Sequence, residues 1–227
     1  QRKVYDDYKN YYRHHLLNKI DESGMNKSAI YVLEGLTRLR QICDSPAMVK
    51  DEKVETTESI KLDELLREVL ENTGNRQILI FSQFTKMLKI IEEAFTQQNI
   101  SHVYLDGKTP SAKRKALVDE FQGDQSIKAF LISLKAGGVG LNLTAAEYVY
   151  LVDPWWNPAI ESQAIDRTHR IGQTQKVFAY KMICKDTIEE KILQLQQKKK
   201  ALSDELISEE VSFIKKLTKD DVEFLFS

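Results

Sequence analysis

The chain has 227 residues, of which 42% are hydrophobic and 30% charged, enough to bury a sizeable core as one domain with an appendage or as two small domains. Its 33 basic and 34 acidic side chains give a net charge of −1, so overall charge does not indicate a nucleic-acid partner, and any anion site must be a local patch. Cys43, Cys184 and the four histidines match no metal or redox spacing, which agrees with a reducing, intracellular setting.

The sequence contains no signal peptide and no long apolar run, so we expect a soluble protein with no membrane partner. It begins with Gln1 instead of an initiator methionine, and we expect it to be part of a longer protein.

Helical periodicity covers residues 1–42, with a break at Asp21–Lys27 that predicts a turn between two helices. Tyrosines recur at helical spacing in the first helix, at Tyr5, Tyr8, Tyr11 and Tyr12. Such a stripe could stack on bases, but a half-buried packing face is the more frequent outcome. Ser45–Pro46 ends this region, and the charged, threonine-rich residues 51–58 are predicted to form a linker.

Strands alternate with helices beyond this linker. The predicted strands are the apolar runs 77–82, 102–106, 127–133, 148–152 and 177–184. A helical pattern starts at Ser59, before the first strand. Further helical patterns start between strands, at Phe84, Thr109–Pro110 and Asn157–Pro158. Apolar runs joined by helical crossovers favour a parallel sheet covered by helices on both faces, so the predicted fold class is α/β.

Two further helices are predicted at the end of the chain. Residues 187–190 have the capping-box pattern Thr-Ile-Glu-Glu, which predicts the start of a long helix that reaches about residue 207. Lys198–Lys200 on this helix could touch a phosphate backbone, but a solvated face is the more frequent explanation. A short helix over Asp220–Phe226 closes the chain.

Candidate functional residues are concentrated in residues 147–173, EYVYLVDPWWNPAIESQAIDRTHRIGQ. Asn157–Pro158 combines an N-cap residue with a proline at the first helical position. One side of the predicted helix carries Gln163, Arg167 and Arg170, and another carries Ile160, Ala164 and Ile171, which can face a core. Guanidinium groups suit phosphate because they are always charged and offer a planar fork of donors. For two arginines alone, however, a solvated helix face is the more frequent explanation.

Ligands of open parallel sheets gather at the carboxyl ends of the strands. The residues that follow the predicted strands include hydroxyls, small residues, two lysines and an aromatic pair: Ser82–Phe84, Asp106–Thr109, Ser133–Gly140, Asp153, Trp155 and Trp156. This composition suits the binding of a phosphate backbone.

A dinucleotide site is the rival interpretation of the glycine cluster. Gly138 and Gly140, with Asp153 at the end of the next strand, faintly resemble a dinucleotide fingerprint, but Leu143 stands in place of the third glycine. Residues 134–146 also leave little room for a full crossover helix. The sequence contains no G-x-x-x-x-G-K-[ST], so it has no P-loop, and it shows no Ser/His/Asp arrangement or metal cage.

The segment LISLKAGGVGLNLTAAEYVYLVDPWWNPAIESQAIDRTHRIGQ resembles the segment that marks the SWI/SNF-type, helicase-like ATPases of superfamily two. The resemblance extends in order through LRQICDSP (39–46), QILIFSQF (77–84), YLDGKTPSAKRKALVDEF (104–121) and DTIEEKILQLQQKK (186–199). It implies that residues 59–185 form the second of two RecA-like lobes. Residues 1–50 would lead from a first lobe outside this sequence, and residues 186–227 would hold a brace helix and a C-terminal helix.

The resemblance also implies roles for residues by position. Arg167 and Arg170 look like arginine fingers that reach the γ-phosphate of ATP held by the other lobe, with Gln163 in the same cleft. Gly138 and Gly140 would approach the nucleotide. The DNA backbone would be contacted by Ser82, Thr109, Ser133 and Lys135. Trp156 would make an aromatic contact with DNA. Arg114 matches an arginine whose role stays open between a functional contact and a structural salt bridge. Asp44–Ser45 departs from the family pattern, in which a histidine usually precedes the proline.

The function implied by the resemblance is the C-terminal motor lobe of an ATP-dependent translocase or remodeller of double-stranded DNA. ATP and Mg²⁺ would be bound mainly by the first lobe, so this chain alone is expected to be an inactive ATPase, and a DNA-bound protein is a further candidate substrate. Its location would be the cytoplasm and nucleoid of a prokaryote or the nucleus of a eukaryote. The alternative is a non-motor module that binds nucleic acid or protein and retains the lobe fold.

Overall fold

The structure is a computed structural model that describes residues 1–49, 51, 54, 56–136, 141–154, 158–166, 175–198, 214 and 216–227. It divides into two compact units, which are described separately. One unit comprises residues 62–182, here called the lobe, and the other comprises residues 1–61 and 183–227, here called the helical unit.

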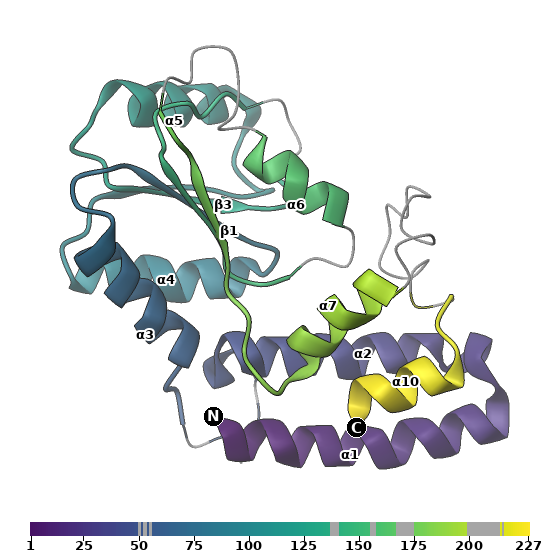
Figure 1. Cartoon of the computed structure of the whole chain (residues 1–227). Coiled ribbons are helices and arrows are strands. Elements are labelled where there is room, and N and C mark those ends of the chain that lie inside the picture. Colours follow the sequence, from purple (N-terminus) through teal and green to yellow (C-terminus); the bar gives the residue numbers. More distant parts are fainter. Residues whose placement is uncertain are drawn as a thin grey trace. The chain divides into compact units, whose positions relative to one another are not determined.

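The lobe is built on a five-stranded sheet (Figure 1). Its strands are β1 (Ile78–Ser82), β2 (His102–Leu105), β3 (Ala129–Ser133), β4 (Tyr148–Leu151) and β5 (Phe178–Lys181). Their order across the sheet is β2-β3-β1-β4-β5, and every neighbouring pair is parallel. The predicted α/β class with a parallel sheet is therefore confirmed.

Helices connect the strands and lie on both faces of the sheet (Figure 1). The helices are α3 (Ile60–Arg67), continued by the π-helical turn η2 (Glu68–Asn72), α4 (Thr85–Gln97), α5 (Ser111–Gly123) and α6 (Pro158–Ile165). Helix α4 covers one face, and α5 and α6 cover the other. Pro158 is the first residue of α6, as predicted, because the fixed φ of proline suits a position whose N–H has no helical partner.

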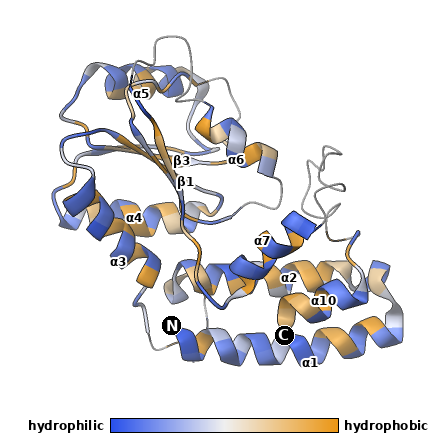
Figure 2. Cartoon of the chain, in the orientation of Figure 1, coloured by the Kyte–Doolittle hydropathy of each residue, from blue (hydrophilic) through white to orange (hydrophobic). Residues whose placement is uncertain are grey.

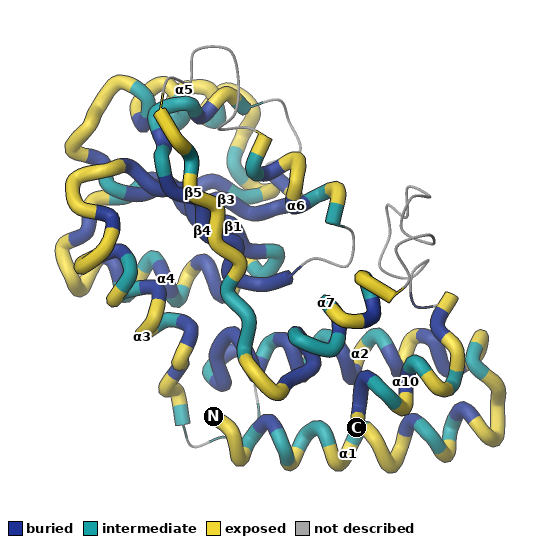
Figure 3. The backbone as a smooth tube through the Cα atoms, in the orientation of Figure 1, coloured by how far each residue is buried: buried dark blue, intermediate teal, exposed yellow. Residues whose placement is uncertain are grey.

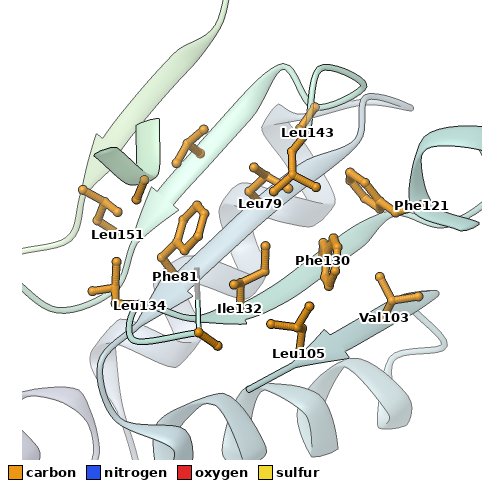
Figure 4. Packing of buried hydrophobic residues seen from close by; sticks show 14 of the residues in the cluster. Leu79, Phe81, Val103, Leu105, Phe121, Phe130, Ile132, Leu134, Leu143 and Leu151 are labelled. Carbon is orange, nitrogen blue, oxygen red and sulfur yellow. The ribbon is translucent and has the colours of Figure 1, made fainter. Parts of the chain in front are cut away.

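The face of the sheet beneath α5 and α6 holds a hydrophobic core of the lobe (Figure 4). The ring of Phe121 on α5 lies 5.3 Å from the ring of Phe130 on β3. Around this pair pack Leu79, Phe81, Val103, Leu105, Ile132, Leu143 and Leu151. The central strands carry continuous hydrophobic colour in Figure 2 because they are buried on both faces.

The edge strand β5 departs from the expectation of a fully covered sheet. All residues of β1, β3 and β4 are buried, whereas all four residues of β5 are exposed (Figure 3). Phe178 and Tyr180 are 42% and 43% exposed, and their rings stack on their strand partners Tyr148 and Tyr150 at 5.3 and 5.4 Å. An apolar run cannot distinguish this edge strand from a central strand, since aromatic residues favour strands in both places.

The helical unit is formed by both ends of the chain. It contains α1 (Arg2–Ser23), α2 (Met25–Asp44), the 3-10 turn η1 (Pro46–Met48), α7 (Ile188–Lys198) and α10 (Lys219–Phe226). Gly24 joins α1 to α2 with φ of +76°, a conformation that side chains disfavour, and it provides the predicted turn. The predicted last helix is confirmed as α10, which begins with a capping box between Thr218 and Asp221.

Close packing of three helices within this unit depends on Gly35 in α2. A Cβ atom at this position would lie 3.0 Å from the Tyr12 ring of α1 and 3.1 Å from the Phe226 ring of α10. The tyrosine stripe of α1 is the predicted half-buried packing face, because Tyr5 is buried whereas Tyr11 is 55% exposed. The Tyr5 hydroxyl accepts a hydrogen bond of 2.6 Å from the backbone N–H of Ile188 at the start of α7.

A buried cluster of charges joins three segments of the helical unit. The Nζ atom of Lys61 lies 2.8 Å from Oδ1 of Asp44 at the end of α2 and 2.5 Å from Oε1 of Glu189 in the first turn of α7. All three side chains are at most 4% exposed. Burial alone would lower the pKa of Lys61, but the two carboxylates more than offset this and raise the pKa above its usual value.

The predicted long helix over residues 187–207 is observed as α7 up to Lys198, and its remainder lies outside the described residues. Among the helices that the structure does describe, none is both long and apolar enough to cross a bilayer.

Candidate nucleic-acid and nucleotide interface

The carboxyl ends of β1 to β4 meet at one edge of the lobe's sheet, because all these strands are parallel. Ser82 ends β1 and lies in register with Ser133, which ends β3. The β2 strand is paired with β3 so that Leu105 lies beside Ile132, and Asp106 follows at the same edge. The structure therefore brings together the strand ends from which the sequence predicts contacts with DNA.

The end of β1 is tied to the end of β4 by the buried carboxylate of Asp153. The hydroxyl of Ser82 donates to Oδ2 of Asp153, and the backbone N–H of Gln83 donates to Oδ1 at 3.1 Å. The same hydroxyl accepts a 3.0 Å hydrogen bond from the backbone N–H of Phe84, the residue before α4. Ser82 and Asp153 are both fully buried. The hydroxyl of Ser82 thus holds two loops together, and its contact with DNA stays a prediction.

The loop after β2 is a tight turn that Asp106 closes. Its Oδ1 accepts a 2.8 Å hydrogen bond from the backbone N–H of Lys108, and its own N–H donates to Oγ1 of Thr109 at 3.0 Å. Burial alone would raise the pKa of Asp106, but hydrogen bonds from Lys108, Tyr104 and Thr109 more than offset this and lower the pKa below its usual value. The carboxylate therefore remains ionised and holds the turn that presents Thr109.

Arg114 on α5 donates hydrogen bonds to the backbone of the same turn. Its Nε donates to the carbonyl of Thr109 at 2.9 Å, and one terminal nitrogen donates to the carbonyl of Gly107 at 3.3 Å. These backbone contacts give Arg114 a structural role, although through carbonyl groups instead of the salt bridge that the sequence suggested as one option.

The loop after β3 presents one buried hydroxyl and one exposed ammonium group. Ser133 is 2% exposed, whereas Lys135 lies on the surface. The backbone N–H of Leu134 donates to the carbonyl of Ser82 at 2.9 Å, which keeps this loop beside the end of β1. Gly138 and Gly140, the predicted nucleotide contacts in the same loop, lie outside the described residues.

Helix α6 shows the predicted separation of its faces. Ala164 is 4% exposed and belongs to the core, and Ile160 packs against the same cluster, whereas Gln163 is exposed. Glu161 is buried as well, and its carboxylate pairs with Nζ of Lys181 on β5. Trp156, Arg167, Arg170 and Ile171 lie outside the described residues, so their predicted positions stay predictions.

The sequence interpretation missed the role of Asp153 as the link between two loops. It placed Asp153 among the polar residues at the strand ends and in the rejected dinucleotide fingerprint, but gave it no structural role. A carboxylate directly after an apolar strand and before a proline was the available signal. Its partner could not be found from sequence, because Ser82 lies 71 residues away.

Known proteins resemble this chain along most of its length. A family model described as the helicase conserved C-terminal domain matches residues 60–172. The ATP-dependent helicase MG018 of Mycoplasma genitalium, itself named as uncharacterized, is 38% identical over 92% of this chain and 20% of its own length. A putative ATP-dependent helicase/translocase of Bacillus subtilis, YwqA, is 40% identical over 90% of this chain and 22% of its own length. The chain therefore spans about a fifth of the length of these curated relatives.

Solved structures of a SWI2/SNF2 ATPase from Sulfolobus solfataricus are similar in both sequence and fold. The ATPase core in complex with double-stranded DNA is 33% identical, with a TM-score of 0.78 over 98% of this chain and 47% of that chain. The C-terminal domain of the ATPase is 31% identical, with a TM-score of 0.72 over 96% of this chain and 92% of that domain. These findings confirm the resemblance seen in the sequence. The chain belongs to the SWI2/SNF2 family of helicase-like ATPases and corresponds to their C-terminal RecA-like lobe.

Proposed function

We propose that this chain is the C-terminal motor lobe of an ATP-dependent translocase or remodeller of double-stranded DNA. The observation that carries the proposal is the similarity to a SWI2/SNF2 ATPase core in complex with double-stranded DNA, which extends over 98% of this chain. The parent protein would close its two lobes on ATP and reopen them after hydrolysis. Alternate grip of the lobes on one strand would then move the protein along DNA, with a DNA-bound protein as a further substrate.

In this proposal, Arg167 and Arg170 reach the γ-phosphate of ATP bound to the first lobe. They would neutralise the charge that develops on the transferred phosphoryl group. The faces of α6 support this assignment, because Ala164 points into the core whereas Gln163 is exposed. The spacing of the sequence predicts that both arginines share the helical side of Gln163.

DNA would lie across the carboxyl edge of the sheet. Lys135 is exposed there and offers an ammonium group to a phosphate, and the turn of Asp106 holds Thr109 at the same edge. Ser82, Ser133 and Trp156 complete the proposed contacts. Such contacts to the backbone position a protein on DNA without reading its sequence, so the proposal implies little base specificity.

The described residues at this edge do not form a binding site for Mg²⁺. Asp106 and Asp153 are the carboxylates at the strand ends, and both already accept hydrogen bonds from neighbouring loops. The sequence also has no P-loop. We therefore assign Mg²⁺ and most contacts with ATP to the first lobe, and this chain alone should not hydrolyse ATP.

The test uses the full-length protein that contains this chain. Arg167→Ala and Arg170→Ala should each lower DNA-stimulated ATP hydrolysis by about 10³–10⁵-fold, the effect of removing an arginine finger. Arg67→Ala is the matched control, because Arg67 is an exposed arginine on α3 that pairs with Glu64, and it should leave the rate unchanged. Wild-type rates in either finger variant would disprove the finger assignment.

Lys135→Ala tests the DNA contact separately. It should raise the DNA concentration needed for half-maximal stimulation and reduce the slope of log affinity against log salt by about one. Binding of DNA by the full-length protein without any stimulation of ATP hydrolysis would instead support the non-motor binding module.

A further inference from the structure

The only two cysteines of the chain meet in the helical unit, although 141 residues separate them. Cys43 is the penultimate residue of α2, and Cys184 lies in the irregular segment before α7. The thiol of Cys184 donates to the carbonyl oxygen of Cys43 at 3.4 Å. Both Sγ atoms and a carboxylate oxygen of Glu189 lie within 4.8 Å of one another.

The two thiols have different surroundings. Cys43 is 2% exposed, whereas Cys184 is partly open to solvent. Burial raises the pKa of the Cys43 thiol well above its usual value, and a hydrogen bond with Cys184 and the charge of Glu189 raise it further. An oxidant in solution therefore reaches Cys184 first. Cys43 lies beside it as a buried, protonated thiol.

We propose that Cys43 and Cys184 form a reversible disulfide when the protein meets a peroxide. The Cys184 thiol gives up its proton and its sulfur attacks one oxygen of hydrogen peroxide, so that the S–O bond forms while the O–O bond breaks; the released hydroxide takes up that proton as water. The Cys43 sulfur then attacks the sulfenic sulfur, so that the S–S bond forms while the S–O bond breaks. The departing hydroxyl leaves with the Cys43 proton as water, and a thiol reductant restores both cysteines.

A reaction between these sulfur atoms requires only a local movement. The Sγ atoms must approach from a separation below 4.8 Å to bonding distance. Residues 182–184 have no regular secondary structure, so rotation of the Cys184 side chain and a small backbone shift can close this gap without unwinding a helix. The proposal does not depend on the motor function.

A metal ion is the alternative occupant of this cluster, and the contacts of Glu189 disfavour it. One carboxylate oxygen of Glu189 lies 2.5 Å from the ammonium of Lys61, and the other accepts a 2.9 Å hydrogen bond from the N–H of Cys184. A closed zinc site needs four ligands, and the cluster found among the described residues offers three. The nearby ammonium would also repel a cation.

The test treats the native, full-length protein with hydrogen peroxide, alkylates the remaining thiols and digests the product with trypsin. We expect a linked pair of the peptides QICDSPAMVK (41–50) and MICK (182–185), about tenfold or more above the untreated protein, which disappears after reduction. Recovery of both peptides in alkylated form, without the linked pair, would overturn the proposal.

Two variants establish the order of the steps. In Cys43→Ser, Cys184 should accumulate as a sulfenic acid that dimedone traps, because its resolving partner is gone. In Cys184→Ser, Cys43 should stay a free thiol over the same period, because it is buried. One equivalent of zinc in the native wild-type protein, lost in both variants, would replace the disulfide with a metal site.

Discussion

At the scale of single residues, the hydrogen bonds of Asp153 matter most for the proposed interface. Its carboxylate satisfies the Ser82 hydroxyl and the Gln83 N–H and so fixes the loops after β1 and β4. A buried acceptor that serves two donors is costly to remove, because the buried Ser82 hydroxyl and the partly buried Gln83 N–H both lose this hydrogen bond.

We therefore predict that Asp153→Ala lowers the free energy of unfolding by about 2–4 kcal/mol. Asp153→Asn should cost less, since its amide oxygen can still accept from Gln83. Denaturant unfolding measures both values, and Asp119→Ala, an exposed acid on α5, should leave the midpoint unchanged. Equal effects of the alanine and asparagine changes would contradict this account of the loops.

Lys61 gives a second prediction at this scale. Replacing it with methionine leaves Asp44 and Glu189 buried beside each other without their cation, so we expect a loss of about 3–5 kcal/mol in the free energy of unfolding. Lys89→Met is the matched control, because Lys89 pairs with Glu92 on an exposed surface, and it should cost under about 1 kcal/mol. A similar loss in both variants would mean that the buried cluster is not an exceptional contributor to stability.

The positions of individual residues in the fold were easier to predict than the residues that they contact. The sequence placed Ser82 at the end of a strand and Thr109 in the loop after another, where the structure finds them, because apolar runs mark strands well. It did not predict that the Ser82 hydroxyl is buried against Asp153, or that the two cysteines meet. Such pairs depend on which strands and helices become neighbours, and this information is not present in local spacing.

At the scale of helices and strands, Gly35 shows how one position controls packing between helices. Glycine in a helix normally costs stability, and alanine in its place would add about 1 kcal/mol if space allowed. Here the added methyl group meets the rings of Tyr12 and Phe226 at 3.0 and 3.1 Å.

We expect Gly35→Ala to destabilise the protein by about 1–2 kcal/mol, because overpacking outweighs the gain in helix propensity. Gly123→Ala is the control, since a Cβ atom at Gly123, the last residue of α5, would meet no atom within 4 Å. Thermal unfolding of both variants compares them directly. Stabilisation by Gly35→Ala would show that the rings move aside without cost.

Most helices and strands could be predicted because their periodicity, prolines and caps agree with one another. The starts of α6 and α7 are examples, with Pro158 as the first residue of α6 and Thr187 directly before α7, as predicted. The exposure of β5 could not be predicted, because strand order in the sheet decides which apolar run becomes the edge. The stacked rings of Tyr148, Tyr150, Phe178 and Tyr180 partly compensate for the missing cover.

At the scale of the whole molecule, the lobe is inserted into the helical unit. The chain leaves the helical unit after Lys61 and returns at Ile183. Lys61 and Glu189 are in contact, so the two crossing points lie close together within that unit. Insertion at such neighbouring points is how one domain can be accommodated inside another.

This arrangement predicts that each unit folds without the other. Residues 62–182 alone should unfold cooperatively, because they contain their own sheet and core. Residues 1–61 joined to 183–227 by a short glycine-serine linker should do the same. Circular dichroism during heating measures both, and a gradual transition in either protein would show that the units depend on each other.

The insertion also affects how the protein emerges from the ribosome. Helices α1 and α2 are made before the lobe, but α7 and α10, which pack against them, follow only after it. At ~5–20 residues per second, translation of the lobe takes roughly ten seconds. Helix α2 packs against α7 and α1 packs against α10 in the finished protein, so both helices lack these neighbours during that interval. We therefore expect a nascent α1–α2 hairpin to expose apolar side chains until α7 and α10 have been made.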